Sequence, residues 1–440
     1  MLAHDDEYPA KFVSRLKKTR MTTTPLHHLY RTFYKQLRET DAVLHSRPAF
    51  LSAIVPTITP TNGDRSALPR PAMIEKSRTP FMAKEITDYI QKTKVTHWLK
   101  YSAKNVHGRN VTVHIMHCGD DKLVVHDDSI RHGIPLRALN QYRAYVYKIY
   151  AWFHFIHPYV AQDNDCSKTI NLYFYFTPFK KRLPHTAGHT LDQVNANTGF
   201  TYSCGSNPFP GGKKSTEIII FRLEEWFKVL LHETLHNLEL DFNTHAATSL
   251  RDIFPGIRHG ILLSEAYVET WARLLNLAFY VFYDIYGGNG TAAEYSVAIG
   301  RCLHAERVFS LFQADKTLKY MGLSLSKLLD PGFGSTFADK YSENTNIFAY
   351  YILAGLMVFA ADEFIAWCAK NNAFSLIQAP AGGESGPGLT EFKKLIDDLS
   401  KNERIKKAIM EIPELRENGD DHAHANDAND NLTMRMTLWH

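Results

Sequence analysis

The run His-Glu-Thr-Leu-His at residues 232–236 is the feature that most constrains what this chain can fold into. It lies in a segment, 223–240, whose apolar residues predict a helix, and it follows a segment, 217–221, that predicts a strand. Positions four apart on a helix project from one face, so His232 and His236 would present their imidazoles to the same point. The sequence therefore predicts a strand-to-helix junction that carries a two-histidine metal site.

The residue between the two histidines adds a chemical role to this site. Two neutral imidazoles suit Zn²⁺, and a glutamate directly after the first histidine lies beside the metal rather than on it. Glu233 is expected to act as general base: it accepts a proton from the zinc-bound water and returns it to the leaving amine. The competing interpretation is a surface helix with two unrelated histidines, which the apolar Val229, Leu230 and Leu231 disfavour. The run predicts a hydrolase, a zinc metallopeptidase that cleaves peptide bonds.

A catalytic zinc site also needs a third protein ligand and an open position. A three-histidine arrangement would require glycine at position 239 and histidine at 242, where this chain has Glu239 and Phe242. His245 and His259 are near in sequence, but neither falls in a recognisable spacing. A three-histidine site is therefore not expected.

The helix expected at 264–286 offers carboxylates in place of a third histidine. Glu265 and Glu269 lie four residues apart, and their apolar neighbours favour burial over a solvated stripe. Glu265 is favoured as the ligand that completes a His₂Glu set, although Glu269 stays open as an alternative. In the favoured arrangement, Glu269 accepts the remaining N–H of His232 or His236 and so fixes the orientation of that imidazole.

His232, Glu233, His236 and Glu265, with an acidic residue four positions further on, resemble the gluzincin pattern of thermolysin-like peptidases. The chain departs from that pattern at Ser264, where those enzymes have asparagine. The run 218–236 also resembles a group of metallopeptidase-like proteins of large double-stranded DNA viruses, in which a Glu-x-Thr-Asn segment precedes paired tyrosines. Here that place is taken by Glu343-Asn-Thr-Asn346 and Tyr350-Tyr351. The resemblance implies a zincin-like fold over most of residues 80–370 and no known substrate.

Two further roles have candidates. The oxyanion formed in amide hydrolysis needs a donor beside the metal, and Tyr350, Tyr351 and Tyr267 are available, although tyrosines on apolar helices more often fill the core. A peptide substrate commonly binds by adding to an edge strand. The segment 197–202, with Gly199 and Phe200, is the candidate strand, and a plain hairpin is its competing interpretation.

The order of the predicted elements indicates an α+β, zincin-like chain with a small mixed sheet, an active-site helix and a mostly helical C-terminal half. A poorly ordered extension is expected at 1–80, a metallopeptidase domain at 81–413 (halves 81–240 and 241–413) and a disordered polar tail at 414–440. Helices are expected at 27–44, 84–102, 136–155, 223–240, 264–286, 291–313 and 346–369, with two short helices within 389–409, and strands at 111–117, 122–126, 169–177, 199–203 and 217–221.

Composition narrows the setting. A net charge of +4 over 440 residues gives no strong nucleic-acid signal, so a polypeptide is the expected partner. Five scattered cysteines argue against a disulfide framework and for a reducing compartment. Neither a signal peptide nor a membrane span is expected. The sequence therefore predicts an intracellular protein, located in the cytoplasm, in a host cell or in a virion. Two other functions stay open: a catalytically silent zincin-fold structural or host-interaction protein of a large DNA virus, and hydrolysis of a non-peptide amide or ester.

Overall fold

The computed structural model describes most of the chain and divides it into two compact units. The described residues are 12–13, 25–61, 69, 71–72, 82–92, 95–118, 130–131, 133–184, 190–202, 204, 212–242, 246–330, 340–372, 374–380, 386–420 and 432–439. The sheet unit comprises Met1–Asp6, Lys35–Phe179 and Thr198–Leu238, and the helical unit comprises Glu7–Tyr34, Lys180–Asn197 and Glu239–His440.

The sheet unit is built on one six-stranded mixed sheet, as an α+β chain requires. Its strands, in spatial order, are β1 (Thr57–Pro60), β2 (Val95–Val106), β3 (Arg109–Cys118), β6 (Thr169–Thr177), β8 (Ser215–Arg222) and β7 (Gly199–Thr201). The three central strands β3, β6 and β8 run parallel, and β1, β2 and β7 pair antiparallel at the two sides. A separate two-stranded ribbon joins β4 (Ile130–Arg131) and β5 (Ile134–Pro135).

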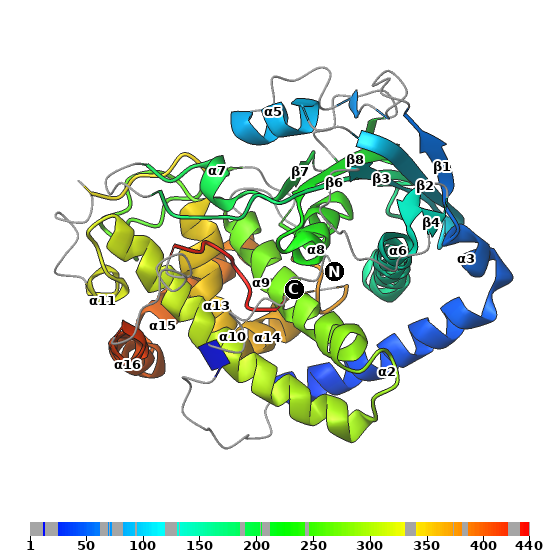
Figure 1. The fold of residues 1–440 in the computed structure, drawn as a ribbon. Coiled ribbons are helices and arrows are strands. Elements are labelled where there is room, and N and C mark those ends of the chain that lie inside the picture. Colours follow the sequence, from blue (N-terminus) through cyan, green and yellow to red (C-terminus); the bar gives the residue numbers. More distant parts are fainter. Residues whose placement is uncertain are drawn as a thin grey trace. The chain divides into compact units, whose positions relative to one another are not determined.

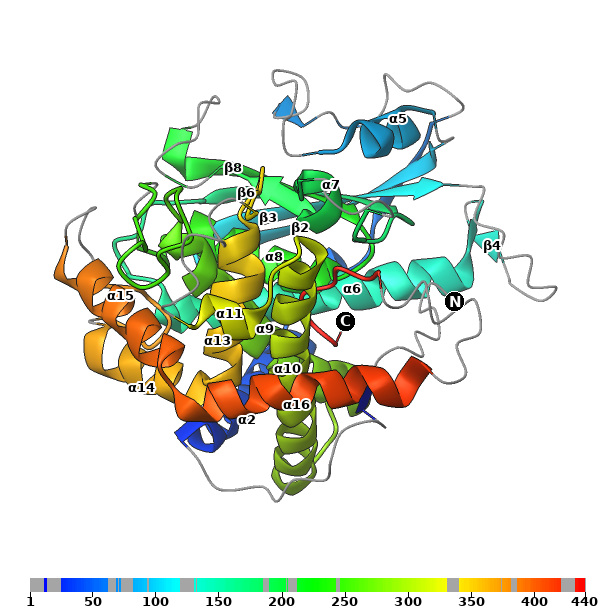
Figure 2. The same ribbon diagram turned by 90° about the vertical axis from the view of Figure 1, so that its left-hand side faces the viewer.

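Two helices cover one face of this sheet. Figures 1 and 2 show α6 (Leu136–Ile156) and α8 (Trp226–Asn237) on that face, and α5 (Lys84–Lys92) on the other. Every residue of α8 is buried, which is the pattern of a core helix rather than of a surface helix. The surface-helix interpretation of residues 232–236 is therefore wrong.

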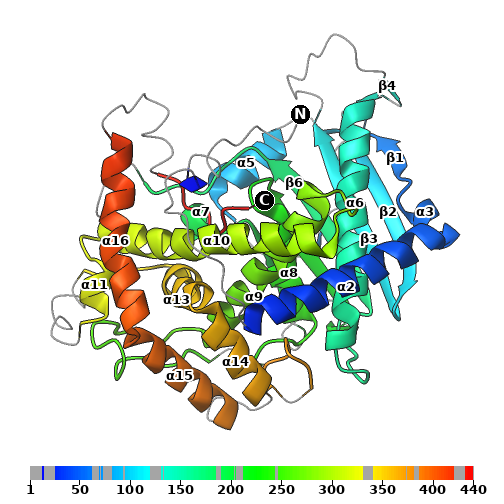
Figure 3. The ribbon, with the colours of Figure 1, turned by 90° about the horizontal axis from the view of Figure 1, so that it is seen from below.

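The helical unit contains most of the other described helices. They are α7 (Gln193–Ala196), α9 (Leu263–Phe279), α10 (Ala292–Tyr320), α11 (Leu325–Leu328), α13 (Ala354–Phe359), α14 (Ala361–Asn371), α15 (Pro387–Ser400) and α16 (Glu403–Asp420), with π-helical segments η5 (Tyr280–Ile285) and η7 (Phe348–Leu353). Figure 3 shows α16 crossing the long α10, and these two helices are in contact. The helix expected at 346–369 is instead broken, because the chain bends by 92° between Phe359 and Ala361.

The main error in the sequence-based elements concerns residues 84–102. Only α5 at Lys84–Lys92 is helical, and β2 follows as the antiparallel partner of β3. Leu99, Tyr101 and Ala103 are buried and alternate with exposed residues, a period of two that fits a strand and that the helix assignment overlooked. The partner expected for β3 at 122–126 lies outside the described residues.

The two ends of the chain are more ordered than composition indicated. Within 1–80 the structure contains α2 (Pro25–Ser46), α3 (Pro48–Ala53) and β1, which pairs with β2 in the main sheet. Within 414–440, the side chains of Met434, Met436 and Leu438 are buried. Their alternation with Arg435 and Thr437 is a local apolar pattern that the polar average of the tail conceals.

Among the described residues, no single helix combines the length and apolarity needed to cross a membrane, whereas the bent pair Phe348–Phe359 and Ala361–Asn371 meets both criteria when taken together.

Candidate metal centre

The metal-binding helix starts abruptly after the strand that precedes it. Strand β8 ends at Arg222, and Glu225 then takes a left-handed backbone conformation with φ 57°. Helix α8 therefore begins at Trp226, three residues later than expected, and the side chain of Glu225 forms no capping hydrogen bond. This tight turn carries the chain from the sheet straight into the buried helix.

The two histidines of α8 face each other across one turn. Their side chains are buried, with 5% of His232 and 8% of His236 exposed, and their Nε2 atoms lie 3.3 Å apart. Zinc–nitrogen bonds of about 2.0–2.1 Å in tetrahedral geometry separate two ligand nitrogens by about 3.3–3.4 Å. Hydrogen bonds from N–H groups are usually shorter, about 2.9–3.0 Å. The separation therefore fits two imidazoles that share one cation better than it fits a direct hydrogen bond.

Glu233 shares this helix and is shielded from water, with 9% of its surface exposed. It lies one residue after His232, so its side chain is rotated by about 100° from that of the histidine. The geometry of α8 thus places the expected general base beside the imidazole pair and off the face that the pair occupies.

Thr234 lies on the opposite side of α8 and joins it to α6. The indole N–H of Trp152 in α6 donates to the Thr234 hydroxyl over 2.8 Å, and that hydroxyl donates to the carbonyl of Leu230 over 2.7 Å. Both side chains are buried. This contact fixes the rotation of α8 about its axis and hence the direction in which the histidines point.

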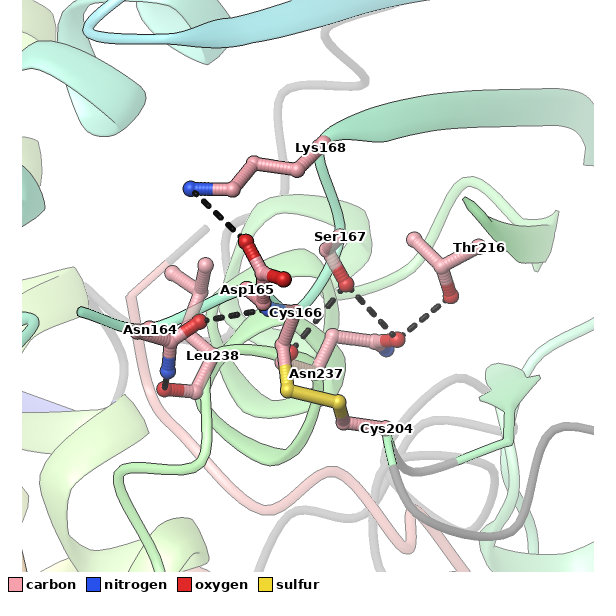
Figure 4. Close-up of a disulfide and its surroundings, with 9 residues drawn as sticks. All are labelled: Asn164, Asp165, Cys166, Ser167, Lys168, Cys204, Thr216, Asn237 and Leu238. Atoms are coloured by element: carbon pink, nitrogen blue, oxygen red, sulfur yellow. Dashed lines mark hydrogen bonds and ion pairs between the residues drawn. A yellow bond between two sulfur atoms is a disulfide. The ribbon is translucent and has the colours of Figure 1, made fainter. Parts of the chain in front are cut away.

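A buried asparagine anchors the other end of α8, as Figure 4 shows. The Nδ2 group of Asn237 donates to the main-chain oxygen of Glu233 and to the Thr201 hydroxyl, each over 2.9 Å. Its Oδ1 accepts a hydrogen bond from Thr216, and the Ser167 hydroxyl donates to its main-chain oxygen over 3.1 Å. One side chain thereby ties the motif helix to β7 and β8.

A disulfide lies next to this anchor. Cys166, in the loop before β6, is bonded to Cys204, just after β7, with 5.7 Å between their Cα atoms (Figure 4). The sequence-based expectation of no disulfide is wrong for this pair. The two cysteines are 38 residues apart, and only the pairing of β6 and β7 with β8 brings them together. As a disulfide the pair offers no thiolate to a metal.

The two glutamates proposed from sequence both lie on α9 in the helical unit. Glu265 is in the first turn and is partly exposed, and its role as a ligand stays a prediction. Glu269 is 1% exposed, and its Oε1 accepts a hydrogen bond from Nε of Arg273 over 2.9 Å. That guanidinium also donates to the main-chain oxygen of Tyr350 over 2.6 Å. The role of Glu269 toward a histidine stays a prediction.

The three tyrosines proposed from sequence, Tyr267, Tyr350 and Tyr351, differ in their burial and in the hydrogen bonds of their hydroxyls. Tyr351 is fully buried and donates to the main-chain oxygen of Met434. Tyr267 is also buried, and its hydroxyl donates to the carbonyl of Ile377 over 2.8 Å. Tyr350 is only half-buried and lies in the π-helical segment η7, a type of distortion that is frequent at functional sites. Its hydroxyl accepts a hydrogen bond from Nδ2 of Asn346 over 3.4 Å, and a role for any of the three tyrosines toward an oxyanion stays a prediction.

The expected substrate strand exists and is the short edge strand β7. Gly199 lies so close to its neighbours that an added Cβ would be 2.7 Å from the main-chain oxygen of Ile219 in β8 and 3.0 Å from Val229 in α8. Gly199 thus permits a close approach of β7 to β8 and α8, rather than to a substrate. Phe200 is 5% exposed, with its ring near that of Phe221. Peptide binding along β7 stays a prediction.

Sequence reasoning missed the supports of the helix, Trp152, Thr234 and Asn237, and the disulfide. The signal that could have found Asn237 is a polar residue directly after the second histidine, in a helix that is otherwise apolar. His245 lies outside the described residues, and His259 is paired with Glu343 over 2.8 Å.

Comparison of the chain with protein-family models, curated proteins and solved structures finds no match.

Proposed function

We propose that the chain is a zinc-dependent peptidase of gluzincin type with a zincin-like fold. The proposed ligands are His232, His236 and Glu265, each of which offers one nitrogen or carboxylate oxygen, a set that could hold a metal ion. The observation that carries the proposal is the 3.3 Å separation of the two Nε2 atoms on a fully buried helix. A pair of imidazoles without other purpose would gain little from facing each other in this way.

In the proposed mechanism of peptide hydrolysis, different residues take part in the chemistry and in positioning the active-site helix. When bound, zinc would polarise the scissile carbonyl and acidify the attacking water. Glu233 accepts the proton of that water and later delivers it to the amine that leaves. The contacts of Thr234 and Asn237 keep α8 in one orientation, so that the histidines and Glu233 need no rearrangement when substrate binds.

Two further roles are proposed with this mechanism. The hydroxyl of Tyr350, which accepts a hydrogen bond from Nδ2 of Asn346 over 3.4 Å, donates to the oxyanion. Glu269 stabilises the site indirectly: its charge is balanced by Arg273, which in turn binds the main chain of Tyr350. A polypeptide adds to the edge of the sheet at β7, close to the helix that carries the ligands.

The test is to purify the full chain, measure its zinc content and incubate it with a mixed peptide library. We expect one zinc per chain, cleavage of a subset of peptides, and loss of zinc in His236→Ala. Glu233→Gln should keep the zinc and lose at least about 10³-fold in activity, since it removes the general base. The matched control is Glu403→Gln, at a carboxylate on the surface, which should change neither the zinc content nor the activity.

Each other outcome has a definite meaning. A Glu233→Gln variant as active as the parent would contradict the mechanism. Stoichiometric zinc without cleavage of any peptide would favour the catalytically silent protein, and an absence of zinc after metal reconstitution would overturn the metal centre itself. Cleavage of esters or small amides alone would retain the centre and change the substrate.

A further inference from the structure

Five basic side chains gather in the sheet unit, in elements other than the metal-binding helix. They come from the turn between β2 and β3, the start of β3, the end of α6, the turn η2 (His157–Tyr159) and the residue before α3. We refer to them as the basic cluster: His107, Arg109, His154, His157 and Arg47.

The three imidazoles of the basic cluster are in direct contact. Nε2 of His107 lies 2.6 Å from Nδ1 of His154, and their ring centroids are 4.4 Å apart. The ring of His157 stacks on that of His107, with centroids 4.0 Å apart and planes at 15°. These contacts place three groups close together, each of which would carry a positive charge when protonated.

The charge of the basic cluster is not balanced within the described residues. The groups that act electrostatically on His154 are Arg47 and His157, and the group that acts on His157 is Arg109; all of them are basic. Burial together with these neighbours lowers the pKa of His107 to about 4 and lowers the pKa values of His154 and His157. At neutral pH the imidazoles are therefore uncharged, and the two guanidiniums carry the charge.

Two buried nitrogen atoms in the basic cluster lack a hydrogen-bond partner in the described structure. Arg109 is only 6% exposed, and its Nε has no acceptor. Nδ1 of His157 likewise has no hydrogen-bond partner. A buried donor without an acceptor costs about 1–3 kcal/mol, and more when the group is charged. What Nε of Arg109 lacks is an acceptor, and what the two arginines lack is negative charge.

We propose that the basic cluster is a binding site for a tetrahedral dianion, a phosphoryl or sulfuryl group. Guanidinium groups suit this ligand because their planar fork matches two oxygens of a phosphate. Imidazole N–H groups supply further donors, and each can take up a proton when the anion arrives. A divalent cation is disfavoured at the same place, since Arg47 and Arg109 would repel it.

The proposal has a consequence for pH that separates it from a plain surface charge effect. A dianion raises the pKa values of the histidines that it contacts, so the complex holds more protons than the unoccupied site. Affinity must then rise as the pH falls below neutral, until His107 of the unoccupied site is itself protonated near pH 4. Sulfate is the appropriate probe, since it remains a dianion over this range.

The experiment is calorimetric titration of the full chain with sodium sulfate at pH 8, 7, 6 and 5, with chloride keeping ionic strength constant. We expect saturable binding that tightens by at least about tenfold from pH 8 to 5, with proton uptake seen in buffers of different ionisation enthalpy. Arg47→Gln, at an exposed position, should weaken binding by about tenfold. Arg137→Gln, at an exposed position of α6 outside the basic cluster, should not change it.

Two arms distinguish the source of the ligand. Inorganic phosphate and a phosphate monoester such as glycerol phosphate are titrated at pH 8, where both are dianions. Equal affinity indicates free phosphate as the ligand, and tighter binding of the ester indicates a phosphorylated metabolite. The proposal would be overturned if sulfate did not bind, if its binding did not depend on pH, or if Arg47→Gln left its binding unaltered. Tight binding of Zn²⁺ that is lost in His154→Gln would overturn it as well.

Discussion

The side-chain amide of Asn237 donates to the main-chain oxygen of Glu233, one turn earlier in the same helix, over 2.9 Å. This bond closes the last turn of α8 at the residue proposed as general base. The other bonds of the same amide reach Thr201 in β7 and Thr216 in β8. One buried side chain thus joins α8 to β7, the proposed substrate strand, and to β8.

Truncation of that side chain should therefore affect both stability and metal binding. Asn237→Ala leaves the hydroxyls of Thr201 and Thr216 without one partner each, so we expect a loss of about 2–4 kcal/mol in the free energy of unfolding. Zinc affinity should fall as well, since the turn that carries His236 loses its anchor. Urea unfolding and competition with a zinc chelator measure the two effects.

The matched control is Asn371→Ala in α14. Asn371 also donates to a main-chain oxygen four residues back, that of Trp367, over 2.8 Å, but it is less buried. We expect its loss to cost about 1 kcal/mol or less and to leave zinc affinity unchanged. Equal losses of stability in the two variants would contradict the special role of Asn237.

The disulfide should stabilise the same region in its oxidised form. Cys166 and Cys204 close a loop of 38 residues, for which chain entropy gives about 4 kcal/mol. Cys204→Ala should lower the free energy of unfolding by up to this amount, and a reductant should destabilise the parent but not the variant. Cys368→Ala, at a buried cysteine outside the disulfide, should leave the response to reductant intact. A parent that unfolds identically with and without reductant would show that the bond does not form.

The sequence predicted those parts of the site that depend on local spacing. Four-residue spacing on an apolar helix was enough to place His232 and His236 on one face, and the strand before them was found for the same reason. What it could not predict depends on pairing between distant segments. Asn237 meets Thr201, and Cys166 meets Cys204, only because β6 and β7 both pair with β8. No pattern within either segment contains that information.

The errors arise from patterns that a broad reading of a segment conceals. Within residues 84–102 a local period of two was overlooked, and pairing with β3 makes residues 95–106 a strand. Composition alone described residues 414–440 as disordered, yet Met434 and Leu438 fit spaces in the helical unit, where the amide of Leu438 donates to Glu306 over 2.9 Å. Averages over a segment do not reveal a few well-placed apolar side chains.

A buried histidine in β3 should make the protein sensitive to acid. Burial lowers the pKa of His114 from 6.5 to about 4, and the ring stacks on Tyr173 with centroids 4.7 Å apart. Below pH 6.5 the unfolded chain takes up a proton that the folded chain resists, so stability is lost as the pH falls toward 4. His114→Phe keeps the stacking and removes this proton uptake.

The measurement is the free energy of unfolding at pH 7.5 and pH 4.5. We expect the decrease between these values to be about 2 kcal/mol smaller in His114→Phe than in the parent. His28→Gln, at an exposed position, should leave the decrease as it is in the parent. If His114→Phe loses as much stability on acidification as the parent, the burial of this imidazole is not what makes the fold acid-sensitive.

Gly199 should be the least replaceable glycine of the sheet unit. A Cβ at this position would lie 2.6 Å from Cδ1 of Ile220 and 2.7 Å from the main-chain oxygen of Ile219, and the second atom belongs to the paired strand and cannot move aside. Gly199→Ala should therefore separate β7 from β8 and lower the free energy of unfolding by about 3 kcal/mol. Gly287→Ala provides the comparison, because that residue has φ 56° and no atom within 4 Å of an added Cβ. At Gly287 only backbone strain acts, which should lower the free energy of unfolding by about 1 kcal/mol.

Since β7 is the proposed binding strand, Gly199→Ala should also raise the KM of a cleaved peptide more than it lowers kcat. Similar costs for the two variants would show that β7 can shift away from β8 without penalty.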